Sequence, residues 1–279
     1  MFRVFSRIDE KLVNPLFEVF DGGDFVLSSY RDVESDLTDV QLYFPEKSRI
    51  GEAETLLKAL LDIVGASSAK VECEEVPDED WKLSYRKHFK TERIGKRLVV
   101  RPKWEPMPED GIVLTLDPGL AFGTGRHETT RACLEYIDEL SGEGGSFLDM
   151  GCGSGILSIA ASLLGYSPVA GFDVDPEAVE ASERNAMENG VKPEFFRYAL
   201  GGKAKRPLPK SDLVVANILG PLLVRFAGEI APAVGKRLVI SGILSTIYDE
   251  VLAAYRELGF AEAGRKTFGE WTTGLLVRG

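Results

Sequence analysis

Cysteine is scarce in this chain, with three residues (Cys73, Cys133 and Cys152) among 279. Their wide spacing provides neither a disulfide framework nor a CxxC metal site. No apolar run approaches the roughly 18–20 residues that a membrane-spanning helix needs. The N-terminal segment MFRVFSRIDE also lacks the apolar core of a signal peptide. We therefore expect a reduced, cytoplasmic protein.

Basic charge is also in short supply, because 33 Lys and Arg stand against 44 Asp and Glu, a formal net charge of −11. This balance argues against broad, sequence-independent binding of duplex nucleic acid, since phosphates need a basic face. The chain is 44% hydrophobic and 28% charged, which is typical of a globular protein. At about 100–200 residues per domain, its length fits one large domain or two unequal ones.

The first 76 residues are predicted to form a small ferredoxin-like α+β domain. Apolar patterning predicts strands over 1–8, 24–32, 39–46 and 69–76, and helices over 9–23 and 49–64. This order is the split β-α-β-β-α-β arrangement. The segment contains 16 acidic and 8 basic residues. Its charge is either an ordinary solvated surface or a docking surface for a basic macromolecule.

Residues 77–92 are predicted to form a linker helix, because Trp81, Tyr85 and Phe89 recur every four residues. Residues 93–279 then form the larger domain, which begins with two short strands separated by a proline-containing loop. From Ser146 onward strands alternate with helices, the latter over 156–164, 176–189, 221–234 and 246–259. This predicts a doubly wound, Rossmann-like α/β sheet. The last two strands follow each other directly, which predicts a C-terminal antiparallel hairpin.

The first strand–helix turn of the larger domain reads Asp149-Met-Gly151-Cys-Gly153-Ser-Gly155. Glycines let the backbone turn sharply after a strand and approach a nucleotide closely. Asp173 follows Gly151 by 22 residues, near the ~20-residue interval expected for an acidic residue that holds ribose hydroxyls. Together these features predict a nucleotide-binding turn.

The glycine spacing disfavours a dinucleotide. The sixth position of a GxGxxG motif is Ile156 when counted from Gly151 and Ser158 when counted from Gly153, so neither frame fits. Asp149 would place a carboxylate near a pyrophosphate, whereas it suits a cationic ligand group. With the terminal hairpin, the pattern resembles the Rossmann-like S-adenosylmethionine-dependent methyltransferases. That resemblance implies that the carboxylate lies near the amino-acid portion of the cofactor.

Asn217 ends the fourth strand of the predicted sheet, in the segment Asn-Ile-Leu-Gly-Pro over 217–221. A polar amide at this position points into the crevice where doubly wound sheets bind ligands, although asparagine is also common in turns. Nitrogen-methylating enzymes of the same fold carry Asn-Pro-Pro-aromatic here. Both prolines and the aromatic residue are missing, which argues against planar-base and glutamine-amide substrates.

Residues 116–130 read LDPGLAFGTGRHETT. Taken alone, this is a glycine-rich loop that enters a helix with hydroxyls as N-cap candidates. His127 has no His or Cys partner nearby, so we expect no metal site. The whole run resembles the signature of the ribosomal protein L-eleven (L11) methyltransferases. The resemblance covers about residues 75–279 and includes FLDMGCGSGILSIAA, GFDVDPEAVEAS and VVANIL.

The resemblance implies S-adenosylmethionine as cofactor and ribosomal protein L11 as substrate. By position, it assigns cofactor contacts to Thr130, Gly151, Asp173 and Asn217, to which the turn adds Asp149, Gly153 and Gly155. It matches Phe122, Gly123 and Thr124 to a loop that covers the cofactor and shapes the methyl-transfer cavity. It also implies that the small N-terminal domain recognises the substrate. Glu128 and Gly220 depart from the proline and alanine that are common in the family.

Methyl transfer from a sulfonium is an in-line displacement, so such an enzyme mainly positions its reactants and excludes water. A lysine amine must be neutral to attack, and the sequence compels no dedicated base. We expect Asn217 and nearby backbone carbonyls to orient the amine. The expected function is methylation of lysine side-chain and N-terminal amines of L11 by a monomer. The alternatives are a lysine methyltransferase for another protein, a nucleotide-binding oxidoreductase and a non-enzymatic binding module.

Overall fold

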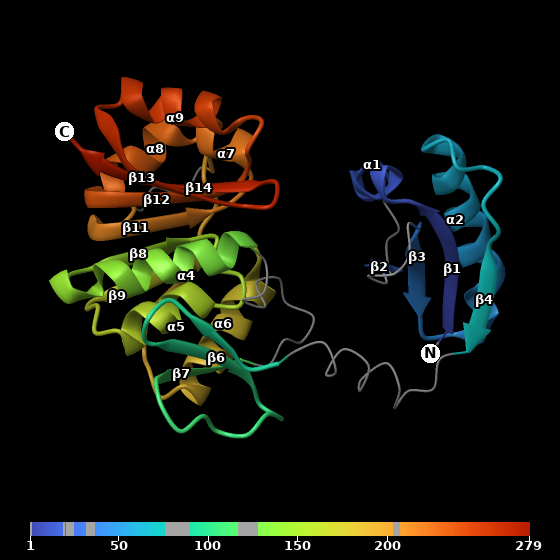
Figure 1. The fold of residues 1–279 in the computed structure, drawn as a ribbon, viewed down its shortest axis with the longest axis horizontal. Helices are drawn as coiled ribbons and strands as arrows, with labels where there is room; N and C mark the ends of the chain where they lie inside the picture. The colour runs from blue at the N-terminus through green and yellow to red at the C-terminus, as the bar shows by residue number, and fades with distance from the viewer. Residues whose placement is uncertain are drawn as a thin grey trace. The chain divides into compact units, whose positions relative to one another are not determined.

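The computed structural model describes residues 2–18, 20, 25–31, 37–75, 90–116, 128–202 and 207–279. The chain divides into two compact units, Met1–His88 and Phe89–Gly279 (Figure 1). The expected linker helix over 77–92 falls almost entirely outside the described residues. Each unit is therefore considered by itself.

The first unit has the predicted split arrangement of strands and helices. Its four-stranded sheet has the order β2-β3-β1-β4, and every neighbouring pair is antiparallel. This confirms the ferredoxin-like fold. Its elements are β1 (Phe2–Asp9), η1 (Glu10–Leu12), α1 (Val13–Glu18), β2 (Val26–Arg31), β3 (Leu37–Phe44), η2 (Lys47–Arg49), α2 (Ile50–Ile63) and β4 (Glu72–Glu75).

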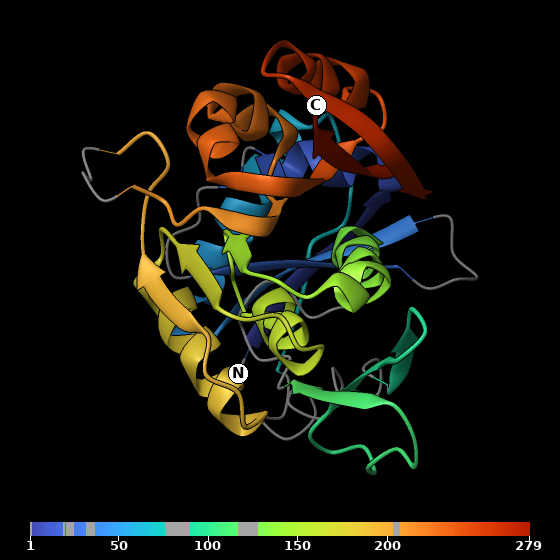
Figure 2. The same cartoon turned by 90° about the vertical axis from the view of Figure 1, so that its left-hand side faces the viewer.

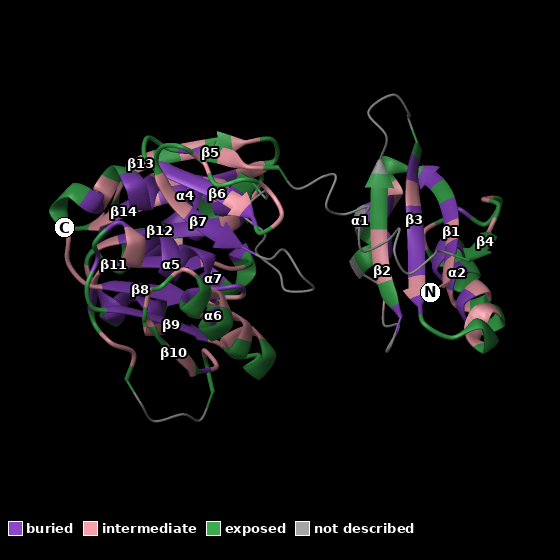
Figure 3. Ribbon diagram, turned by 90° about the horizontal axis from the view of Figure 1, so that it is seen from below, coloured by how far each residue is buried: buried purple, intermediate pink, exposed green. Residues whose placement is uncertain are grey.

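The core of the first unit follows from the two sequence periods. Helix α2 buries Ala53, Leu57 and Leu60 at helical spacing. Alternate positions of the strands, among them Val4 and Leu42, bury their side chains in the same cluster. Less buried residues interrupt the buried ones along β1 and β3, as the pink and green segments of Figure 3 show.

A three-stranded sheet opens the second unit. The two strands predicted here are β6 (Leu98–Pro102) and β7 (Ile112–Leu116), which pair in parallel. A further strand, β5 (Glu92–Ile94), was not predicted, and it pairs antiparallel with β6. Three residues are too few to show an alternating pattern, and the partner strand stabilises them as a hairpin.

The main sheet is doubly wound, as predicted. Its strand order is β10-β9-β8-β11-β12-β14-β13, with β8 to β12 parallel and β14 antiparallel to both neighbours. The elements of this part of the chain are α4 (Glu128–Leu140), η3 (Ser141–Glu143), β8 (Phe147–Met150), α5 (Ile156–Leu163), β9 (Val169–Asp173), α6 (Pro176–Glu188), β10 (Glu194–Arg197), β11 (Ser211–Asn217), α7 (Gly220–Arg225), α8 (Ala227–Ile230), η4 (Ala231–Ala233), β12 (Val234–Leu244), α9 (Tyr248–Glu257), β13 (Phe260–Phe268) and β14 (Trp271–Arg278).

Helices cover both faces of this sheet. Buried residues of α4, α5 and α6 form one core cluster with one face of the strands, and those of α7, α8 and α9 form a second cluster with the other. Figure 1 shows the two helical layers, and in Figure 2 the sheet extends from the yellow strands β9 and β10 to the red hairpin of β13 and β14. Strands buried on both faces read as continuous apolar runs, which is why they were recognisable in the sequence.

One predicted helix is wrong. The helix expected over 221–234 is divided into α7, α8 and the 3-10 turn η4, and Val234 already begins β12. Phe226 leaves the helical region with φ of −107°. Pro232 then removes a backbone donor, which prevents a long regular helix. Within the described residues, no helix is both long and apolar enough to cross a membrane.

Candidate active site

The candidate site lies at the carboxyl ends of β8, β9 and β11. Strand β8 is flanked by β9 on one side and by β11 on the other, so the chain order reverses at this point of the sheet. Doubly wound sheets bind ligands in the crevice at such a reversal. The fold thus brings together Asp149, Asp173 and Asn217, which lie far apart in the sequence.

The turn after β8 depends on glycine. Gly151, Gly153 and Gly155 have φ of 76°, 53° and 78°, a region that disfavours residues with a Cβ atom. The N–H groups of Gly151 and Cys152 both donate to the carbonyl of Phe172 at 2.9 Å, which ties the turn to the end of β9. The strands and the turn therefore form one rigid edge.

The turn also packs too closely for side chains. A Cβ atom on Gly151 would lie 2.8 Å from Cγ2 of Ile218, and one on Gly155 would lie 2.9 Å from Cβ of Ser182. Helix α6 fixes the turn further, because the hydroxyl of Ser182 donates to the carbonyl of Gly153 at 3.0 Å. Sequence reasoning missed Ile218 and Ser182, because only the folded chain brings them to the turn.

Asp149 is completely buried at the end of β8. Its Oδ2 accepts hydrogen bonds from the backbone N–H of Ser158 at 3.2 Å and from the Ser158 hydroxyl at 2.9 Å. Its Oδ1 has no hydrogen-bond partner among the described residues. Burial raises the pKa of Asp149 to about 7, and the nearby charge of Asp173 acts in the same direction. An unpartnered buried oxygen needs a donor from outside the described chain, such as a ligand or a water molecule.

Asp173 ends β9 beside the turn. Its Oδ2 accepts a hydrogen bond from the N–H of Gly153 at 2.9 Å, and its Oδ1 accepts one from the N–H of Asp175 at 3.1 Å. Each carboxylate oxygen can accept a further hydrogen bond. The side chain is only partly buried. It is therefore anchored at a fixed place with capacity left for the hydroxyls of a ligand.

Asn217 and Thr130 meet across the site, although 87 residues separate them. The amide Nδ2 of Asn217 donates to Oγ1 of Thr130 at 3.4 Å. Asn217 ends β11, whereas Thr130 is buried in the first turn of α4. Thr129 and Thr130 lie inside α4, which begins at Glu128, so they are not the N-cap hydroxyls that we expected. Within the described part of the chain, the amide carbonyl of Asn217 accepts no side-chain hydrogen bond.

Ser241 is a further residue that sequence reasoning missed. It pairs with Asn217 across β11 and β12, and its hydroxyl donates to the carbonyl of Thr129 at 3.3 Å. It also lies 2.6 Å from the hydroxyl of Thr273 in β14. A serine within an apolar strand was the only local signal of this contact.

Cys152 lies within the turn, but it is a poor nucleophile. Burial and the nearby Asp149 raise the pKa of its thiol, so the reactive thiolate is disfavoured. Phe122, Gly123 and Thr124, assigned above to a loop over the cofactor, lie outside the described residues, and their roles remain expectations. The structure thus brings Thr130, Asp149, the glycine turn, Asp173 and Asn217 to one edge of the sheet.

Comparison with known proteins identifies the family of this chain. Residues 19–278 match the family model described as ribosomal protein L11 methyltransferase (PrmA). A protein of that name from Azotobacter vinelandii is 46% identical over 207 residues, which cover 73% of this chain and 70% of the relative. One from Caldanaerobacter subterraneus subsp. tengcongensis is 38% identical over 263 residues, which cover 92% and 81%.

A solved structure supports the same assignment. The crystal structure of a ribosomal protein L11 methylase from Lactobacillus delbrueckii subsp. bulgaricus is similar with a TM-score of 0.62 and 30% identity. The match covers 68% of this chain and 99% of that chain. This structure and the family model, which matches residues 19–278, indicate the same family. The chain belongs to the ribosomal protein L11 methyltransferase family.

Proposed function

We propose that this protein transfers methyl groups from S-adenosylmethionine to lysine side-chain and N-terminal amines of ribosomal protein L11. Membership of the family supports the reaction and the substrate. The structural observation that supports it most directly is the contact between Asn217 and Thr130 beside the glycine turn. Among the described residues the amide carbonyl of Asn217 accepts no side-chain hydrogen bond, so it could serve as the acceptor that a reacting amine would need.

The residues at this edge fit S-adenosylmethionine. The turn at Gly151 leaves no room for a side chain, as expected where the backbone borders a ligand. The buried, unpartnered Oδ1 of Asp149 suits a donor on the cationic amino-acid portion. The anchored carboxylate of Asp173 would accept hydrogen bonds from the ribose hydroxyls. When bound, the cofactor supplies a methyl group activated by the positive charge of its sulfonium.

The protein's own contribution is positioning. The amine nitrogen must attack in line with the bond that breaks, so its lone pair has to be aimed. The carbonyl of Asn217 would accept a hydrogen bond from the amine N–H and fix that direction. The amine must also be neutral, and a neighbouring cation together with desolvation lowers its pKa. The amine nitrogen would gain the methyl group that the cofactor supplies, and the resulting ammonium would lose its proton to solvent.

The first unit is proposed to recognise the protein substrate. Its first 76 residues contain 16 acidic and 8 basic residues, which account for most of the chain's net negative charge. Three carboxylates, Glu72, Glu74 and Glu75, lie exposed on the edge strand β4. A ribosomal protein rich in lysine and arginine would complement this charge. The same segment carries no residue of the candidate site, so it would affect substrate affinity and leave the chemistry unchanged.

The test is incubation with isotope-labelled S-adenosylmethionine and a mixture of unmethylated large-subunit proteins, followed by mass spectrometry. Label on L11 at lysine or at the N-terminal amine is the expected result. Label on a different protein, with L11 unlabelled, would contradict the substrate and would leave the reaction intact.

A further inference from the structure

The first turn of α4 is held on its inner side by the candidate site. Thr130 accepts the hydrogen bond from Asn217 at 3.4 Å, and the carbonyl of Thr129 accepts one from Ser241 at 3.3 Å. The first turn of a helix has unsatisfied N–H groups and frays readily. Two inner contacts at 3.3–3.4 Å are long for hydrogen bonds. These contacts and the packing of the buried face of α4 hold the inner side of the turn, and its outer side carries a separate set of contacts.

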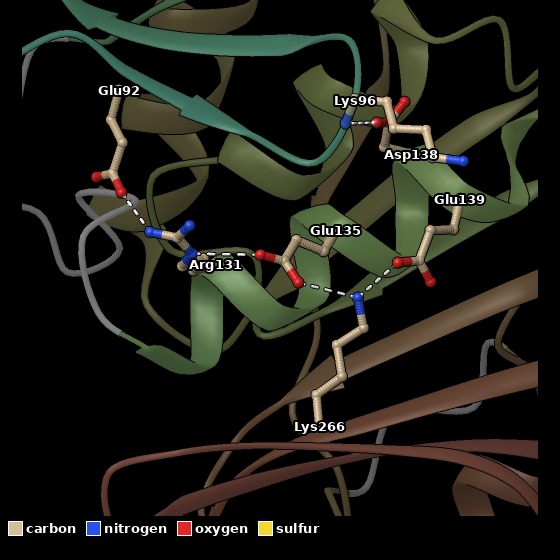
Figure 4. Close-up of polar contacts among 7 residues, drawn as sticks. All are labelled: Glu92, Lys96, Arg131, Glu135, Asp138, Glu139 and Lys266. Atoms are coloured by element: carbon tan, nitrogen blue, oxygen red, sulfur yellow. Dashed lines mark hydrogen bonds and ion pairs between the residues drawn. The ribbon is translucent and has the colours of Figure 1, made fainter.

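Arg131, the next residue, holds the outer side of this turn. Its guanidinium donates to Glu92 of β5 and, at 3.2 Å, to Glu135 one turn further along α4 (Figure 4). Lys266 of β13 donates to the second oxygen of Glu135 at 2.9 Å and to Glu139 at 2.7 Å. A chain of alternating charges thus follows one face of α4 and ties it to two other strands.

The charge of Arg131 is unfavourable at this place in the helix. Cations near a helix N-terminus are repelled by the helix dipole, so Glu92 and Glu135 must offset that repulsion. The side chains of Arg131 and Glu92 are 40% and 38% exposed, and pairs this exposed add little to folding stability. The main contribution of these contacts is to orientation, because the planar guanidinium of Arg131 binds the carboxylates of Glu92 and Glu135 at defined angles.

We propose that Arg131 is a positioning residue for the cofactor site. With Glu92 and Glu135 it holds the first turn of α4 so that Thr130 stays within reach of Asn217. Through Glu92, strand β5 thereby contributes to the site without touching it. This inference rests on the proposed function, because binding of S-adenosylmethionine is its readout.

The experiment is titration calorimetry with S-adenosylmethionine on Arg131→Gln, Glu92→Gln and the double variant. We expect each single change to raise Kd by about threefold to tenfold, with Tm almost unchanged. The double variant should bind no more weakly than Arg131→Gln, because both changes remove the same contact. Arg131→Lys should bind S-adenosylmethionine more tightly than Arg131→Gln but less tightly than the unaltered protein, since lysine keeps the positive charge and lacks the planar guanidinium.

Arg93→Gln is the matched control. Arg93 lies next to Glu92 in β5 and forms a 2.6 Å ion pair with Asp110, which precedes β7; the two side chains are 45% and 80% exposed. Among the described residues, its side chain forms no ion pair with α4. We expect this variant to bind like the unaltered protein. The inference is contradicted if Arg131→Gln binds S-adenosylmethionine with full affinity, or if Arg93→Gln loses as much affinity as Arg131→Gln. It is also contradicted if Arg131→Gln loses affinity only together with a clear decrease in Tm. No binding by the unaltered protein would instead contradict the proposed function.

Discussion

Asn217 is the side chain on which the proposed chemistry depends most directly. Its amide Nδ2 donates to Thr130, and its carbonyl, which accepts no side-chain hydrogen bond among the described residues, is proposed to accept one from the substrate amine. Replacement by Ala removes both groups, so the side chain at this position no longer orients the lone pair of the substrate amine. We expect kcat at saturating cofactor to fall by about tenfold to a hundredfold. Asn217→Asp keeps an acceptor oxygen and should retain more activity than the Ala variant, and equal kcat in all three proteins would exclude the proposed role.

Asp173 should act on cofactor affinity. Its carboxylate accepts from two backbone N–H groups and is proposed to accept from the ribose. Loss of hydrogen bonds to a charged group predicts that Asp173→Ala weakens S-adenosylmethionine binding by about tenfold or more, measured by calorimetry. Asp175→Ala is the control, because Asp175 caps α6 through the N–H of Glu177. It should lower Tm slightly and leave Kd unchanged.

Asp149 should make folding stability depend on pH. Its pKa is raised by burial to about 7 in the folded protein, whereas an unfolded Asp titrates near about 3.9. The folded state therefore holds the proton more tightly, and stability falls as pH rises from about 4 to about 7. The amide side chain of Asp149→Asn cannot ionise, so the stability of this variant should lack the decrease with pH that comes from Asp149. The free energy of unfolding of the unaltered protein, relative to this variant, should decrease across that range, and a constant difference would contradict the pKa.

At the scale of elements, the sequence predicted what local patterning determines. The strands β8, β9 and β11 are apolar runs buried on both faces, and the terminal hairpin lacks any intervening helix. The division near Phe226 was missed, because helical spacing continues through it and only Pro232 interrupts the backbone pattern. Strand β5 was missed because its partner strand rather than its composition determines it.

The site was predictable where it follows a strand end, and not where it depends on contacts between distant segments. Asp149, Asp173 and Asn217 follow from the rule that ligands bind at the carboxyl ends of parallel strands. Ser241 and Arg131 carry no such signal, since each acquires its role from residues that lie in other elements. Side-chain contacts across more than a hundred residues, such as Ser241 with Thr129, arise only when the sheet is assembled.

The glycine turn offers a test at this scale. Gly151→Ala would force a Cβ atom against Ile218 and a residue into positive φ. We expect a loss of about 1–3 kcal/mol of stability and a large loss of cofactor binding. Gly228→Ala, with no atom within 4 Å of its Cβ position, should be neutral or slightly stabilising, since Ala favours helices. Cofactor binding by Gly151→Ala at full affinity would argue against the turn as part of the site.

At the scale of the whole molecule, the division of charge matches the division of labour that we propose. The first unit is acidic and has no site residue, whereas the second unit contains every described site residue. Reversing Asp62 and Glu75 to Lys should raise KM for L11 by several-fold and leave KM for the cofactor unchanged. The increase should shrink as salt rises, because exposed charges are screened.

The matched control makes the same change in net charge on the second unit. Glu183 and Glu250 are exposed and belong to α6 and α9. Reversing both to Lys should leave KM for L11 near its original value. An equal increase in KM for L11 in the two variants would show that only the overall charge matters. An unchanged KM for L11 in both variants would show that the acidic surface of the first unit is an ordinary solvated surface.

The central claim is that this chain methylates ribosomal protein L11 through the site around Asn217. Intact-mass spectrometry of purified, unmethylated L11 after incubation with the protein and S-adenosylmethionine tests it most directly. We predict that the mass of L11 increases by whole multiples of one added methyl group, and that Asn217→Ala slows the increase. An unchanged mass of L11, with a folded protein that binds the cofactor, would contradict the account.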